Sequence, residues 1–409
     1  MKIGSFFENF LKRESFFVDK SVLSSSYLPD EVLYREEQLQ EVANILAPAL
    51  RQEKPSNLFI YGKTGTGKTL SIKHIIQSMS SIAKKNDISL RCIYINCKLK
   101  KVADTEYRLI AQIIRELGGD VPATGLPTDE VYHTFYSLLE SKEQLLILIL
   151  DEIDQLVKKA GDEILYNLTR INTELRASQV SILGISNDLV FADHLDPRVK
   201  SSLSEEELIF PPYNALQLQD ILRGRAKEAF REGTIEPGVI EKCAAYAARE
   251  HGDARRALEL LRVAGELAER SSTPSVALSH IDGAEDKIER DRIVDVVQAH
   301  PRQFQATLYA IISFCESKSG ALYTGEIYSL YQSFCSRLGL RPLTQRRLSD
   351  IVAELDMLGI INARVLSKGR YGRTREIGLS LAPELVAKIK KVLEHELGVR
   401  DTEGEKDGE

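Results

Sequence analysis

The chain of 409 residues is poor in cysteine, in long apolar runs and in net positive charge. Its five cysteines are scattered apart from Cys92 and Cys97, so neither a disulfide framework nor a zinc site with regular spacing is indicated. We expect reduced, mostly buried thiols in a cytoplasmic protein. The longest apolar run, residues 145–150, is far shorter than the ~20 residues of a membrane-spanning helix. Charges near the start, including Lys2 and Glu8, argue against a signal peptide.

Charge and length set two further limits. The net charge of −6 argues against a uniformly basic nucleic-acid-binding surface, but it is compatible with a local basic patch. With 43% hydrophobic and 28% charged residues, the composition is that of a soluble globular protein. The length predicts two or three domains, and no internal repeat is apparent.

The most specific motif is a glycine-rich loop, G-x-x-x-x-G-K-T, at residues 62–69. An apolar run at 57–61, predicted to be a strand, precedes it and a helical pattern follows at 70–79, which is the order that a phosphate-binding loop requires. Glycines let backbone N–H groups face a polyphosphate, and the helix N-terminus adds partial positive charge. Lys68 supplies a cation for the β- and γ-phosphates, and Thr69 a hydroxyl for magnesium. The predicted nucleotide contacts are Gly62, Lys63, Thr64, Gly65, Thr66, Gly67, Lys68 and Thr69.

Strands and helices alternate after this loop. Strands are predicted at 90–96, 145–150 and 180–185, and helices at 107–117 and 129–139. The continuous apolar run at 145–150 suits a central parallel strand that is buried on both faces. We therefore expect an α/β base with a parallel sheet over residues 31–208, preceded by an extended arm over residues 1–30.

Polar residues follow two of these strands, at the sheet edge where open α/β folds bind ligands. Asp151 would hold magnesium, directly or through water, and Glu152 would polarise an attacking water. Asn187 would contact the γ-phosphate or that water, although asparagine after a strand also forms turns. Arg198, after a proline turn, suits the stabilisation of charge on a transferring phosphoryl group, in the same subunit or in a neighbouring one.

From Pro211 the pattern changes to short helices without strands, so residues 209–295 are predicted to form an all-helical lid. Asp253 is a suitable N-cap for a helix with an apolar face that includes Leu258 and Leu261. Arg255 lies in the first turn of that helix, where a cation opposes the helix dipole. It is therefore either a solvated surface arginine or a partner for an anion such as a nucleotide phosphate.

The pattern over residues 296–395 predicts a winged helix-turn-helix. Three helices precede two strands, and a basic tip at 367–374 joins these strands. Between Arg337 and Glu376, nine basic side chains stand against four acidic ones, so this region carries about +5. The cations lie at the start of the third helix and at the tip, which are the two places that meet DNA grooves. The alternative is that this basic cluster is only a solvated face or a protein-binding surface. The predicted DNA contacts are Arg346 and Arg347 on the helix, suited to base edges, and Gly369, Arg370, Tyr371 and Arg373 at the tip. Residues 396–409 form a charged tail.

Together these segments resemble the archaeal origin-recognition and helicase-loading initiators of the AAA+ class, over about residues 17–381. The most specific parts are YGKTGTGKT at 61–69, LDEID at 150–154, ISND at 185–188, GDARRA at 252–257 and SKGRYGRT at 367–374. The resemblance implies an AAA+ base, an all-helical lid and a C-terminal winged helix. It assigns Asn187 and Arg255 to the two nucleotide sensors of the family. It also assigns Arg198 to the arginine finger, which acts on a nucleotide bound by a neighbouring subunit.

The resemblance implies further contacts. Residues 27–36 match the segment that packs on adenine in the family, with Tyr34 where the family usually has histidine. The cofactor site then also includes Tyr27, Arg35, Tyr213 and Arg225. Thr124 and Gly125 lie in what resembles the initiator-specific helical insertion, which touches the DNA backbone in the family.

The expected function is that of a slow ATPase that binds duplex DNA at replication origins and helps load the MCM helicase. ATP or ADP and Mg²⁺ are the expected cofactors; origin DNA, MCM and further copies of the protein on DNA are the expected partners. Hydrolysis would change the angle between lid and base.

A nucleotide-switched transcription regulator is one alternative function, and such a protein would protect many promoters from cleavage in a footprint. A STAND-type or clamp-loader ATPase is another, and it would hydrolyse quickly in a stable ring; a clamp loader would carry a helical collar instead of the winged helix.

Overall fold

The computed structural model describes residues 14–99, 102–122, 125–203, 205–271, 273–317, 322–367 and 373–399. They form two compact units, and the chain passes from one to the other between Asp282 and Gly283. The first unit contains an α/β base and a helical lid, and the second contains the winged helix. Helix α12, Leu278–Ala299, continues across this division. The lid boundary expected at residue 295 therefore lies inside a helix.

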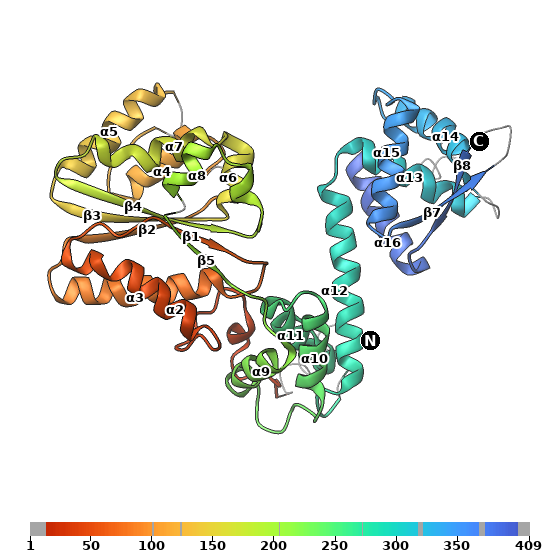
Figure 1. The fold of residues 1–409 in the computed structure, drawn as a ribbon. Helices are drawn as coiled ribbons and strands as arrows, with labels where there is room; N and C mark the ends of the chain where they lie inside the picture. The colour runs from red at the N-terminus through yellow and green to blue at the C-terminus, as the bar shows by residue number, and fades with distance from the viewer. Residues whose placement is uncertain are drawn as a thin grey trace, which may run out of the picture. The chain divides into compact units, whose positions relative to one another are not determined.

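A five-stranded parallel sheet forms the centre of the base (Figure 1). Its strands are β1 (Leu58–Tyr61), β2 (Leu90–Asn96), β3 (Gln144–Asp151), β4 (Ser178–Ser186) and β5 (Glu206–Ile209), in the order β2-β3-β4-β1-β5. Four of these strands agree with the prediction. The edge strand β5 was missed because it is short and three of its side chains, including Ile209, face solvent, which gives no apolar run.

Helices cover both faces of the sheet (Figure 1). One face is covered by α2 (Glu36–Leu46) and α3 (Lys68–Lys85), and the other by α4 (Glu106–Glu116), α5 (Thr128–Glu140), α6 (Ile153–Ala160), α7 (Glu163–Arg170) and α8 (Pro197–Leu203). Single 3₁₀ turns lie at η2 (Ala47–Arg51), η3 (Ile171–Thr173) and η4 (Phe191–His194). Strand β3 is fully buried because alternate side chains enter the two cores, Ile147 on the α3 side and Leu148 on the other. This confirms the central strand that its continuous apolar run predicted.

The lid consists of α9 (Ala215–Ala229), α10 (Val239–Arg249) and α11 (Ala254–Ser271). Asn214 begins α9 with a capping box: its side chain accepts the Gln217 N–H, and the Gln217 side chain accepts the Asn214 N–H. Asp253 begins α11, because its Oδ1 accepts the backbone N–H groups of Arg255 at 2.8 Å and Arg256 at 3.2 Å. The N-cap predicted from the sequence is confirmed.

The N-terminal segment, residues 14–33, packs on the lid instead of extending as an arm. Its 3₁₀ turn η1, Lys20–Leu23, follows Phe17, whose ring lies 4.5 Å from that of Phe230. A side chain on Gly265 would come within 2.6 Å of the Phe17 ring, so this glycine makes room for it. Backbone bonds from Val18 to Ala229 and from Arg231 to Phe16 continue the contact. The sequence could not show this, since these partners lie far apart in the chain; residues 1–13 lie outside the described ranges.

The second unit is a winged helix, as predicted. Its elements are α13 (Arg302–Ser317), β6 (Leu322–Tyr323), α14 (Thr324–Arg337), α15 (Gln345–Met357), β7 (Ile361–Ser367), β8 (Arg373–Leu379) and α16 (Pro383–Leu397). The strands form an antiparallel sheet in the order β6-β8-β7. Helix α16 completes the core through Ile389 and Leu393 and packs against α13. All five cysteines lie in the described residues, and none of them forms a disulfide bond. Among the described residues, none of the helices has the length and apolar character needed to cross a membrane.

Candidate nucleotide-binding site

A cavity of about 550 Å³ lies in the first unit between the base and the lid. Its size is within the range of pockets that hold small ligands, roughly 300–1,000 Å³. The wall includes the N-terminal segment, the glycine loop, the ends of β3 and β4, and the lid helices α9 and α11. The predicted site residues that line it are Tyr27, Gly65, Thr66, Gly67, Lys68, Thr69, Asp151, Glu152, Asn187, Tyr213, Arg225 and Arg255.

The glycine loop connects β1 to α3 with its backbone close to other parts of the unit. Gly65 and Gly67 have φ angles of +70° and +86°, which favour glycine. A side chain on Gly67 would lie 2.7 Å from the Tyr213 hydroxyl, and one on Gly62 would lie 2.6 Å from the Phe210 carbonyl oxygen. The glycines are therefore required by close packing as well as by backbone angle.

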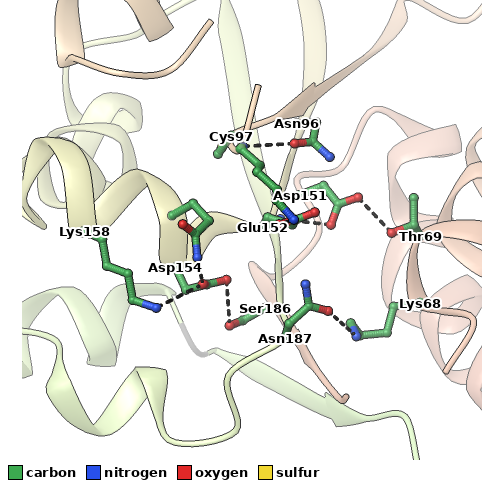
Figure 2. Close-up of polar contacts among 12 residues, drawn as sticks. Lys68, Thr69, Asn96, Cys97, Asp151, Glu152, Asp154, Lys158, Ser186 and Asn187 are labelled. Carbon is green, nitrogen blue, oxygen red and sulfur yellow. Dashed lines mark hydrogen bonds and ion pairs between the residues drawn. The ribbon is translucent and has the colours of Figure 1, made fainter. Parts of the chain in front are cut away.

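Lys68 is the first residue of α3 and is buried. It donates to the carbonyl oxygens of Gly62 at 2.6 Å and Lys63 at 2.8 Å, and to Asn187 Oδ1 at 2.9 Å (Figure 2). Burial lowers the pKa of Lys68 to about 8; the charge of Asp151 opposes this and that of Arg255 reinforces it. The loop and the end of β4 thus hold a cation at the cavity that an anionic ligand would stabilise.

Asp151 ends β3 and accepts hydrogen bonds at both carboxylate oxygens. Thr69 Oγ1 donates to Oδ2 at 2.8 Å (Figure 2), and the Glu152 backbone N–H donates to Oδ1 at 2.9 Å. The hydroxyl of Tyr94, on β2, also donates to Oδ2, at 2.6 Å. Carboxylate and hydroxyl oxygens are hard ligands of the kind that Mg²⁺ prefers, so the donor set fits this ion.

Glu152 follows with a φ angle of +53°, a left-handed conformation that is unusual for a residue with a side chain. Its carboxylate lies 3.6 Å from the Lys98 ammonium. The next acid, Asp154, is buried and engaged elsewhere, since it accepts from Ser186 Oγ at 3.3 Å and lies 3.5 Å from Lys158 (Figure 2). Of these two acids, Glu152 is the one that lines the cavity.

The far end of the cavity is formed by the N-terminal segment and α9. The Arg225 guanidinium lies 4.5 Å from the centre of the Tyr27 ring, and the Tyr27 hydroxyl donates to Glu228 at 2.9 Å. Tyr34, with a φ angle of +60°, donates its hydroxyl to Asp220 of the lid. These contacts join the segment predicted to pack on adenine to the lid.

Arg35 holds parts of the first unit together, and the cofactor contact predicted for it stays a prediction. Its guanidinium donates to the carbonyl oxygens of Thr66 at 2.9 Å and Pro211 at 2.6 Å, and lies 3.8 Å from the centre of the Tyr213 ring. The side chain is buried and does not line the cavity. It ties the glycine loop to the start of the lid, a long-range contact that local sequence patterns do not show.

The tip of the lid touches the glycine loop. The Ala254 N–H donates to the Gly65 carbonyl oxygen at 3.2 Å, and Lys63 Nζ lies 3.3 Å from His251 Nδ1. Arg255 is exposed and lines the same cavity as Lys68. Lys63, together with Gly62 and Thr64, does not line the cavity, so direct nucleotide contacts of these three residues stay predictions.

Arg198 lies on α8, away from the cavity. Its guanidinium makes two bonds of 3.1 Å to the Asp196 carboxylate and lies 5.3 Å from the centre of the Tyr166 ring. A role toward the nucleotide of its own subunit has no support in this position. Its assignment as an arginine finger toward a neighbouring subunit stays a prediction.

The predicted DNA contacts are only partly described. Arg346 and Arg347 lie exposed in the first turn of α15, which Thr344 begins by accepting the Arg347 N–H at 3.5 Å. Gly125 lies in the connection between α4 and α5 with a φ angle of +109° and open space around it. Thr124, Gly369, Arg370 and Tyr371 lie outside the described residues, and of Arg373 only the backbone, at the start of β8, is described.

This cavity and fold define a P-loop nucleotide-binding protein with a helical lid and a C-terminal winged helix. Family models agree: residues 51–187 match an AAA domain, 219–286 the Cdc6 AAA+ ATPase-type lid domain, and 295–389 the CDC6 C-terminal winged helix domain. The chain belongs to the ORC1-type DNA replication proteins, and the resemblance to archaeal initiators is confirmed.

The similarity extends over whole chains. The ORC1-type DNA replication protein of Thermococcus onnurineus is 52% identical over 398 residues, which are 96% of this chain and 94% of the relative. That of Pyrococcus abyssi is 51% identical over 404 residues, or 98% and 95% of the two chains. The Aeropyrum pernix ORC1 protein, solved in complex with DNA, is 46% identical with a TM-score of 0.80, covering 94% of this chain and 98% of that one.

Proposed function

We propose that the chain is an ATP-dependent replication initiator that binds duplex origin DNA and changes state as it slowly hydrolyses ATP. The observation that carries this proposal is the convergence of Lys68, Asn187 and Arg255 on one cavity between base and lid. These side chains come from three separate elements, and the chain also has a winged helix. The relative from Aeropyrum pernix, whose structure is a complex with DNA, supports DNA as the partner.

Each cavity residue has a chemical task in this proposal. Lys68 neutralises phosphate charge, and Arg255 brings a second cation from the lid, where it responds to the same phosphates. Glu152 accepts a proton from, and orients, the attacking water, which Asn187 helps to hold. A magnesium ion held by Thr69 and Asp151 supplies Lewis-acid neutralisation of the phosphates when bound.

The contacts of the single chain support slow hydrolysis. Glu152 lies beside Lys98 at 3.6 Å, and Arg198 is bound to Asp196 by two hydrogen bonds. Glu152 must leave Lys98 before it acts on the nucleotide of its own subunit. Arg198 must leave Asp196 before it acts on the nucleotide of a neighbouring subunit. Ala254, at the tip of the lid, is hydrogen-bonded to Gly65 of the glycine loop. The loop that would bind the phosphates therefore also holds the lid in position.

Origin DNA would bind through Arg346, Arg347 and the tip at 367–374, with a second contact around residues 124 and 125. The MCM helicase and further copies of the protein on DNA are the proposed protein partners. The proposed location is the cytoplasm, at the nucleoid.

A footprint of the purified protein on the origin DNA of its own genome, with ATP and with ADP, tests the proposal. An initiator protects a small number of origin repeats, and the extent of protection differs between the two nucleotides. Lys68→Ala should remove nucleotide binding and with it that difference. Protection of many promoters would favour a transcription regulator, and intact nucleotide binding by Lys68→Ala would refute the assigned site.

A further inference from the structure

A tyrosine outside both nucleotide motifs contacts the carboxylate expected to hold magnesium. Tyr94 lies on β2, and its hydroxyl donates to Asp151 Oδ2 at 2.6 Å. Thr69 donates to the same oxygen at 2.8 Å, and the Glu152 N–H occupies Oδ1 at 2.9 Å. Three donors therefore fix the rotation of one carboxylate, and two of them converge on a single oxygen.

Tyr94 is itself held in place. β2 pairs with β3 so that Tyr94 lies opposite Ile149 and Asn96 lies opposite Asp151. The Lys73 ammonium, one turn into α3, lies 4.6 Å from the centre of the Tyr94 ring. A tyrosine hydroxyl carries its proton at neutral pH, so it can donate to the carboxylate.

The shared oxygen has a chemical consequence. A hydroxyl such as that of Thr69 can donate its proton to a carboxylate and still offer a lone pair to a cation. Thr69 is oriented in this way only while the Asp151 carboxylate keeps its rotation. Loss of the Tyr94 hydroxyl would leave that rotation to Thr69 and one backbone N–H alone. Residues that hydrogen-bond to a metal ligand typically contribute about 10–100-fold to metal affinity.

We propose that Tyr94 is a positioning residue, which orients Asp151 and Thr69 for the magnesium ion of a Mg²⁺–nucleotide complex. This inference rests on the proposed nucleotide function and specifies one residue that tunes it. Tyr94 does not line the cavity, so it acts through Asp151 and not on the nucleotide.

The test is Tyr94→Phe in the full chain, which keeps the ring and its contact with Lys73. ATP affinity is measured by calorimetry in EDTA and then across a magnesium titration. We expect equal affinity in EDTA and a magnesium concentration for half-maximal tightening that is about 10-fold higher than in the wild type. An unchanged magnesium dependence, or an equal loss of affinity with and without magnesium, overturns the proposal.

Tyr132→Phe is the matched control. The Tyr132 hydroxyl donates to a carboxylate oxygen of Glu106 at 2.6 Å, so the control removes a comparable bond away from the cavity. We expect both variants to lower thermal stability. Tyr132→Phe should leave the magnesium dependence of ATP affinity unchanged. In an Asp151→Asn background, Tyr94→Phe should add no further magnesium defect, because it acts through that carboxylate; an additive defect overturns the proposal. A wild type that binds no nucleotide in either condition would instead refute the nucleotide site itself.

Discussion

At the scale of single residues, burial in the wall of the cavity changes the acid–base behaviour of Lys68. Burial lowers the pKa of Lys68 to about 8, well below the ordinary value of about 10.4. Without a bound anion, the side chain therefore loses its charge progressively as the pH rises through about 8. Because phosphates favour the charged form, nucleotide binding between pH 8 and about 10.4 must take up a proton.

We therefore predict that nucleotide affinity falls as the pH rises above 8. Calorimetry at pH 8.5 in two buffers of different ionisation enthalpy should give different binding enthalpies, with the sign of proton uptake. Lys68→Arg is the control, because guanidinium stays charged and should take up no proton. The stability of the fold changes with pH in the opposite direction. Over the same pH range the unfolded chain binds more protons at Lys68 than the folded chain does, so without nucleotide the free energy of unfolding increases as the pH rises. Equal enthalpies in both buffers for the wild type would contradict the assigned pKa.

Lys98 provides a second prediction at this scale. Its ammonium lies 3.6 Å from the Glu152 carboxylate and is mostly exposed, so the pair contributes at most about 1 kcal/mol. Lys98→Ala should free Glu152 and raise basal ATP hydrolysis by about two- to five-fold, with nucleotide affinity unchanged. Lys158→Ala, which removes the exposed partner of Asp154 at 3.5 Å, should leave turnover unchanged. A turnover that falls in Lys98→Ala would show that Lys98 assists Glu152.

At the scale of elements, the lid depends on one glycine at its tip. Gly252 has a φ angle of +69°, and a side chain there would lie 2.2 Å from the Tyr213 carbonyl oxygen. We predict that Gly252→Ala costs at least about 1–3 kcal/mol of stability and weakens nucleotide binding, because the start of α11 must move away from the loop. Gly325→Ala, in α14 of the second unit, where an added Cβ would meet no atom within 4 Å, should be neutral or stabilise by up to about 1 kcal/mol. Thermal unfolding without nucleotide, followed by ATP titration, compares the two variants, and equal Tm values would contradict this reading.

Local patterns explain which elements could be predicted. The glycine loop, the strand β3 and the Asp253 cap each depend on neighbours within a few residues, so spacing alone places them. The contacts of Arg35 with Pro211, of Phe17 with Phe230 and of Tyr94 with Asp151 depend on the folded chain. Arg35 illustrates the limit: a family motif places it near the nucleotide, but its buried contacts with carbonyl oxygens are visible only in three dimensions.

At the scale of the whole molecule, the nucleotide cavity and the arginines proposed to read DNA bases belong to different compact units. The nucleotide cavity lies wholly in the first unit, whereas Arg346 and Arg347 belong to the second. Substitutions on α15 should consequently change DNA binding without changing intrinsic nucleotide affinity.

The prediction for the whole molecule uses the salt dependence of DNA binding. Each phosphate contact that is lost should reduce the slope of log affinity against log salt by about 0.9, whereas a lost base contact should lower affinity and relax sequence preference. We expect Arg346→Ala with Arg347→Ala to weaken binding to origin DNA more than to random duplex, because arginine at the start of this helix suits base edges. Lys388→Ala with Lys390→Ala is the charge-matched control, since these lysines pair with Asp291 and Glu316 elsewhere in the same unit. An equal loss on both DNAs, with a slope reduced by about 1.8, would show that the α15 arginines contact phosphates instead.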